Sequence, residues 1–136
     1  EEKYDVASAI EVLEHIPPNE LGEFIKSIVS ILDTNGVLIL TVPSNNLPVQ
    51  DKHYQHFSKD KLENFLSPYF QKREYFFIDP FSRIMDILYC LTGGNGDRFI
   101  VSHSKVVNCF FSIYTKKYLY TSNENLCMRL CVVCTL

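Results

Sequence analysis

The stretch NELGEFIKSIVSILDTNGVLILTVP, residues 19–43, carries a helix pattern followed directly by a strand pattern. Its first half repeats apolar residues at the three- and four-residue spacing of one face of an amphipathic α-helix. Asn35 and Gly36 predict the helix end, with Gly36 in the left-handed conformation that commonly follows a last turn. Residues 37–42, VLILTV, are continuously apolar and rich in β-branched side chains, so we expect a strand buried on both faces.

A second strand pattern lies upstream, in YDVASA at residues 4–9. Strand, helix and strand in close succession form the pattern of a βαβ unit, which joins two parallel strands. The sequence therefore predicts an α/β fold organised around a parallel sheet.

The chain after this unit reads as loop, helix and strand in turn. The polar loop over residues 44–57 leaves the carboxyl end of a predicted strand, where open α/β sheets place their ligands. Ser58 is typical of an N-cap, and it predicts a helix through about Phe65. Further expected elements are a strand at 73–78, a helix at 82–94, an aromatic-rich insertion of helix and loop at about 95–125, and a final strand at 126–136. Within the insertion, FFSIYTKKYLYT is expected to form core with a solvated lysine pair, or alternatively to cover a substrate pocket.

Composition limits the class of protein. The chain has 136 residues and a formal net charge of −3, which gives no electrostatic indication of nucleic-acid binding. No apolar run reaches the roughly 18 residues of a membrane span, and the charged first residues do not form a signal-peptide pattern. Five cysteines, an odd number, favour reduced thiols and a cytoplasmic location.

Two carboxylates and an imidazole interrupt the apolar segment AIEVLEHIPP, residues 9–18. Glu11, Glu14 and His15 are spaced i, i+3 and i+4, so one turn of helix would bring them to a common face. Pro17 is expected to end that turn, because the residue before a proline is disfavoured in the helical region.

The ordered combination YDVASAIEVLEHIPP, amphipathic helix, DTNGVLILTVPS, loop and HYQHFSKDKLENFL resembles the second half of a class I S-adenosylmethionine-dependent methyltransferase of type 11 or 23. The resemblance covers residues 4 to about 70. It implies a Rossmann-like doubly wound sheet with an antiparallel last strand, of which residues 1–136 form the carboxyl-terminal portion. The family's glycine-rich cofactor loop belongs to the half that is absent from this chain, since TGGNGD at 92–97 follows a predicted helix rather than a strand.

The resemblance also implies site residues. Ser8, Ala9 and Ile10 would line the methionine portion of S-adenosylmethionine. Small-RNA 2′-O-methyltransferases and ubiquinone-pathway O-methyltransferases carry a similar Glu-x-x-Glu-His turn, completed by a loop histidine at a divalent-metal site. Carried over to this chain, the ligands of Mg, Mn or Zn would be Glu11, Glu14, His15 and His53.

Two alternatives to this ligand set stay open. His56 competes with His53 for the position of the loop histidine. The turn is also compatible with a metal-free site, in which His15 or His53 acts as a base or orients the substrate, and with a merely solvated helix face.

The function that follows from the resemblance is S-adenosylmethionine-dependent methyl transfer to an oxygen of a small molecule or saccharide, with this fragment alone inactive. One alternative is a non-catalytic remnant, either a truncated product or a pseudoenzyme. A nucleotide-binding oxidoreductase shares the βαβ pattern, but hydride transfer would not call for the Glu-x-x-Glu-His turn.

Three cysteines near the end of the chain, Cys127, Cys131 and Cys134, have the C-x3-C-x2-C spacing of radical S-adenosylmethionine enzymes. They lie in an apolar run that ends two residues later, whereas that motif belongs to a loop near the start of a barrel. Buried, unreactive thiols are therefore the favoured interpretation.

Overall fold

A computed structural model describes residues 2–83, 87 and 104–136, and its centre is a five-stranded sheet in the order β1-β2-β5-β3-β4. The strands are β1 (Tyr4–Ile10), β2 (Leu32–Pro43), β3 (Lys72–Pro80), β4 (Tyr120–Thr121) and β5 (Cys127–Thr135). The helices are α1 (Leu21–Ile31), α2 (Lys59–Leu66) and α4 (Ser104–Ile113), with short helical turns η1 (Leu13–His15), η2 (Tyr114–Tyr118) and η3 (Glu124–Leu126). The helix predicted at 82–94 and the segment TGGNGD fall almost entirely outside the described residues.

The predicted βαβ unit is confirmed. β1 and β2 pair in parallel, and α1 connects them. β5 runs antiparallel between β2 and β3, which confirms the antiparallel last strand. The chain is thus a mixed α/β fold in which the strand latest in sequence occupies the middle of the sheet.

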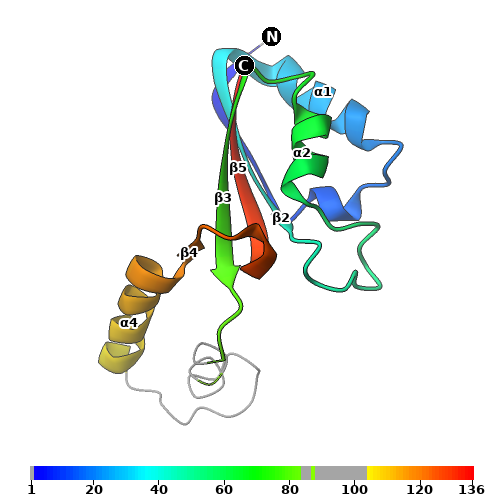
Figure 1. The fold of residues 1–136 in the computed structure, drawn as a ribbon. Coiled ribbons are helices and arrows are strands. Elements are labelled where there is room, and N and C mark those ends of the chain that lie inside the picture. Colours follow the sequence, from blue (N-terminus) through cyan, green and yellow to red (C-terminus); the bar gives the residue numbers. More distant parts are fainter. Residues whose placement is uncertain (1, 84–86, 88–103) are drawn as a thin grey trace.

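One face of the sheet carries the core. Figure 1 shows α1 and α2 on the same side of the strands. On this side, Leu38, Leu40 and Val42 of β2 are fully buried against Ile25 of α1 and Leu62 of α2. Val37, Ile39 and Thr41, which alternate with these residues, are only half-buried, so the prediction that residues 37–42 are buried on both faces was wrong for the second face.

Gly36 does not end the helix in a left-handed conformation, as its sequence context predicted. α1 ends at Ile31, and Leu32 already pairs with Tyr4 of β1. The pairing resumes at Val37 opposite Val6, so the residues between Leu32 and Val37 bulge out of β2. At Gly36 a Cβ atom would lie 2.8 Å from Leu32 Cβ. The glycine is therefore required by close packing inside a bulge.

The helical turn predicted to carry Glu11 is shorter than expected. Only Leu13–His15 is helical, as a 3₁₀ turn, and Glu11 has a φ of 52°. Since Glu11 lies outside the turn, it does not share a helix face with Glu14, and that expectation is corrected. Ile16 returns to extended backbone before Pro17, as the proline requires.

The aromatic-rich insertion does not form core in its described part. Phe111, Ile113 and Tyr120 are exposed, and η2 has no buried residue. In Figure 1, α4 projects away from the sheet beyond β4. None of the described helices combines the length and apolar character needed to cross a membrane.

Candidate functional site

The candidate site lies where β1 and β2 end at the same edge of the sheet. β1 leads into η1, and β2 leads into the loop over residues 44–57. This loop folds back on both segments, because the Tyr54 N–H donates to the Glu14 carbonyl at 2.8 Å and the Phe57 N–H donates to the Pro43 carbonyl at 3.1 Å. The two backbone bonds bring the loop histidines to η1.

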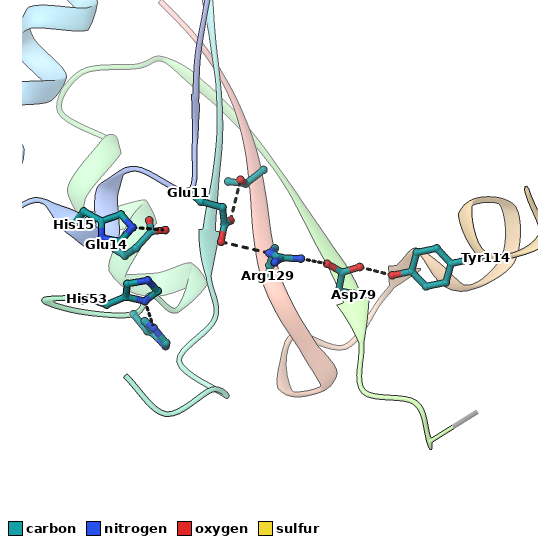
Figure 2. A network of polar contacts seen from close by, with 9 residues as sticks. Glu11, Glu14, His15, His53, Asp79, Tyr114 and Arg129 are labelled. Atoms are coloured by element: carbon teal, nitrogen blue, oxygen red, sulfur yellow. Dashed lines mark hydrogen bonds and ion pairs between the residues drawn. The ribbon is translucent and has the colours of Figure 1, made fainter. Parts of the chain in front are cut away.

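Three of the predicted ligands converge. Potential ligand atoms of Glu14, His15 and His53 all lie within 4.8 Å of one another (Figure 2). The His15 and His53 rings meet edge to face with centroids 4.7 Å apart. Glu14 is 1% exposed, His53 is half-buried and His15 is exposed, so the cluster is closed on one side and open to solvent on the other.

Glu14 is an unusual buried carboxylate. Its Oε2 is buried and has no hydrogen-bond partner among the described residues, and His15 Nε2 lies 3.8 Å from Oε1. Burial raises the pKa of Glu14 above its ordinary value. A buried oxygen with no partner destabilises the folded state, and a bound cation would remove that penalty.

The histidines are oriented by their hydrogen bonds. Because carbonyl oxygens only accept, His56 Nδ1 must donate to the Leu47 carbonyl at 3.0 Å, which leaves His56 Nε2 as an acceptor in the neutral ring. His53 Nδ1 then donates to that nitrogen at 2.8 Å. His15 Nδ1 likewise donates to the Lys52 carbonyl at 3.0 Å. In the neutral form of each ring, His15 and His53 therefore keep Nε2 as the nitrogen that could bind a metal.

This donor set fits a divalent cation. One carboxylate and two neutral imidazoles are typical ligands of zinc and other first-row divalent metals. Imidazole ligands in metal sites commonly donate the N–H of their second ring nitrogen to a carbonyl or another fixed acceptor, as His15 and His53 do here. His56, the competing candidate from the sequence, orients His53 instead of joining the three.

The structure does not bring Glu11 into the cluster. Its Oε1 accepts from the Thr41 hydroxyl at 3.0 Å, and its Oε2 accepts from Arg129 Nε at 3.3 Å. Arg129 also donates to Asp79, which in turn accepts from the Tyr114 hydroxyl (Figure 2). Sequence analysis missed Arg129 and Asp79, because Arg129 lies 118 positions from Glu11 and no local pattern connects them.

The three residues expected at the cofactor lie on alternating sides of β1. Ser8 is exposed and Ile10 is 54% exposed, whereas Ala9 is 4% exposed and packs in the core. Side chains of Ser8 and Ile10 are therefore accessible to a ligand at the end of β1, and Ala9 contributes only backbone there.

The thiols with radical-enzyme spacing lie within β5 and not in a loop. Cys127 and Cys134 are buried and Cys131 is half-buried. Burial raises the pKa of all three thiols, that of Cys134 to about 12. These are conditions in which a thiol is unreactive.

Comparison with known proteins finds similar sequences and folds. A family model described as a methyltransferase domain matches residues 1–84. The fold is similar to a SAM-dependent methyltransferase from Archaeoglobus fulgidus, with a TM-score of 0.62 and 13% sequence identity over 99% of this chain. It is also similar to the small RNA methyltransferase HEN1, with a TM-score of 0.59 and 11% identity over 98% of this chain. No protein of curated function matches the sequence.

The matched structures are longer than this chain. The chain spans 60% of the archaeal methyltransferase and 14% of the HEN1 chain. At these sequence identities the likeness shows a shared fold.

Proposed function

This chain belongs to the class I methyltransferase domain family, and from that premise we propose that the protein transfers a methyl group from S-adenosylmethionine to a hydroxyl oxygen of a small molecule or saccharide. The observation that supports oxygen as the acceptor atom is the cluster of Glu14, His15 and His53 at the carboxyl edge of the sheet. Such a cluster would hold a divalent ion beside the acceptor.

Three residues of the chain would hold the ion. Glu14 offers a buried carboxylate oxygen that has no partner in the described part of the chain, and the hydrogen bonds of His15 and His53 leave Nε2 available in the neutral rings. A bound divalent ion would supply Lewis-acid chemistry, lowering the pKa of the acceptor hydroxyl. The exposed side of the cluster, at His15, is where the acceptor would approach.

Methyl transfer from a sulfonium is a single displacement, so the protein contributes mainly by positioning the two reactants and removing the acceptor proton. Exposed Ser8 and Ile10 at the end of β1 would contact the methionine portion of the cofactor. The chain after β1 and the loop after β2 leave the sheet at the carboxyl ends of these strands, which is where ligands of open α/β sheets bind.

Two variants of this function differ in the acceptor or the base. The fold shared with a small RNA methyltransferase favours an RNA ribose hydroxyl as a second candidate acceptor. In a metal-free site, His15 or His53 would itself accept the proton, as a neutral imidazole can.

Ion binding is the first test. We expect calorimetric titration with Mn²⁺ or Zn²⁺ to give one site in the wild-type protein and in Glu23→Gln, an exposed carboxylate on α1. Glu14→Gln should weaken that site by at least tenfold, since it removes a ligand. Equal binding by the wild type and Glu14→Gln would overturn the assignment of the centre.

Acceptor class is tested separately, with labelled S-adenosylmethionine and a panel of saccharides, small hydroxyl compounds and short RNAs. Methyl transfer to oxygen that stops in a strong chelator and returns with the ion supports the proposal. Full activity in chelator, with no ion bound, favours the metal-free site. No transfer to any acceptor by the longest natural form of the protein would favour a pseudoenzyme.

A further inference from the structure

Arg129 bridges two carboxylates beside the candidate metal cluster. It lies on β5, in register with Pro43 of β2 and Ile78 of β3, at the sheet edge where β1 also ends. Its Nε donates to Glu11 and its Nη1 donates to Asp79 (Figure 2). The arginine therefore ties the chain after β1 to the end of β3.

Glu11 is held from both sides. One carboxylate oxygen accepts from the Thr41 hydroxyl and the other from Arg129, so each oxygen already has a partner away from the cluster. The Glu11 N–H also donates to the Thr41 carbonyl at 3.0 Å. The sequence places Glu11 only three positions before Glu14, and the pKa of Glu14, raised chiefly by burial, is raised further by the Glu11 charge. Glu11 is thus a nearby carboxylate that the fold keeps occupied elsewhere.

The backbone at both ends of this bridge is strained. Glu11 has a φ of 52° and Asp79 a φ of 53°, and these are the non-glycine residues with positive φ in the described part of the chain. Such a backbone conformation persists in a non-glycine residue only where the surrounding structure holds it. Asp79 is held further by the Tyr114 hydroxyl from η2. The bridge thus joins two residues whose backbone conformation depends on their surroundings.

We propose that Arg129 is a positioning residue that withholds Glu11 from the cluster of Glu14, His15 and His53, and so sets which metal the site prefers. The proposal rests on the metal centre of the proposed function. With Glu11 held by Arg129, the site offers two nitrogens and one carboxylate, a set that suits zinc. Release of Glu11 would add a second carboxylate, and oxygen ligands favour harder ions such as magnesium.

The ratio of the Mg²⁺ to the Zn²⁺ dissociation constant tests this directly. Arg129→Met should raise the affinity for Mg²⁺ relative to Zn²⁺ by about tenfold, within the range expected when residues around metal ligands change. Loss of the arginine charge alone acts equally on two ions of the same charge, so it leaves the ratio unchanged. Lys26→Met, which removes an exposed lysine on α1, is the matched control and should not change the ratio.

A double-mutant cycle assigns the effect to Glu11. In a Glu11→Gln background, Arg129→Met should no longer change the ratio, because the released side chain carries no charge. A ratio that stays constant on Arg129→Met, or a shift that persists in the Glu11→Gln background, would overturn the proposal. If no variant binds either ion, the metal centre itself is wrong and this inference fails with it.

A second variant covers the case in which Arg129→Met does not fold. Thr41→Val removes the other hydrogen bond to Glu11 and changes no charge. It should also raise the affinity for Mg²⁺ relative to Zn²⁺, but by less than Arg129→Met does, since Arg129 still holds one oxygen of Glu11. A well-folded Thr41→Val protein with the wild-type ratio, measured by calorimetry alongside its melting temperature, would count against the withholding of Glu11.

Discussion

At the scale of single residues, His56 determines how His53 faces the candidate site. The Leu47 carbonyl fixes the His56 proton on Nδ1, and His56 in turn accepts the His53 Nδ1 proton. The free nitrogen of His53 is thus set by a residue that does not join the cluster. Such outer partners of metal ligands commonly affect affinity strongly.

We expect His56→Leu to weaken divalent-ion binding by roughly 10- to 100-fold, because His53 loses the acceptor that orients its ring. His56→Gln should recover much of the affinity, since the glutamine amide oxygen can accept at the position of the imidazole Nε2. Calorimetric titration with Zn²⁺ measures both. If His56→Leu binds the ion as tightly as His56→Gln does, His56 has only a packing role.

Contacts of single residues were also the hardest feature to predict from the sequence. A family resemblance connected Glu14 and His15 with the loop residue His53, and the structure brings the three together. The diversion of Glu11 could not be predicted, because it depends on a backbone twist at Glu11 and on Arg129 from the other end of the chain. Neither leaves a local pattern.

At the scale of elements, the bulge in β2 explains why a glycine stands at position 36. A Cβ there would meet Leu32 Cβ at 2.8 Å and the Asp33 carbonyl oxygen at 2.9 Å, both fixed parts of the same bulge. At Gly22 of α1, by contrast, the nearest atom is the Tyr69 hydroxyl at 3.4 Å, the end of a flexible side chain.

The same substitution should therefore act in opposite directions at the two glycines. Gly36→Ala is expected to lower the free energy of unfolding by about 1–3 kcal/mol through overpacking. Gly22→Ala is expected to raise it by roughly 0.5 kcal/mol, because alanine restricts the unfolded chain and favours the helix. Urea unfolding followed by circular dichroism gives both values. Destabilisation of equal size at both positions would refute the packing explanation.

The elements themselves were largely predictable, for a physical reason. Periodicity within residues 19–43 and 4–9 is local and reflects burial of one helix face and one strand face, so β1, α1 and β2 were found. The bulge was not found, because Asn35-Gly36 is as typical of a helix end as of a strand irregularity. Only the pairing of β2 with β1 distinguishes the two.

At the scale of the whole molecule, Glu63 links the helical layer to the sheet. Its carboxylate on α2 accepts from Arg73 Nη2 at 2.7 Å and from the Tyr75 hydroxyl at 2.7 Å, both on β3. These bonds, led by the arginine, lower the pKa of Glu63 from 4.5 to about 2. A depressed carboxylate pKa means that the contribution to stability is complete above pH 4.5 and is lost as the pH falls toward 2.

Glu63→Gln should accordingly melt at a lower temperature than the wild type near neutral pH, and the difference should shrink between about pH 4.5 and pH 2. Melting temperatures across that range provide the measurement. Glu23→Gln, which loses an exposed pair with Lys26, should stay close to the wild type throughout. A difference for Glu63→Gln that does not vary with pH would mean that the carboxylate charge is not responsible.

The buried, unpartnered oxygen of Glu14 also bears on the evolutionary history of this chain. An apolar residue at position 14 would be favoured by stability alone, so drift should erase the carboxylate in any lineage that no longer uses the site. Purifying selection is then the force that retains it. In homologous chains, loss of Glu14 should accompany loss of His15 and His53, and the pattern of descent would separate working enzymes from relatives that keep only the fold.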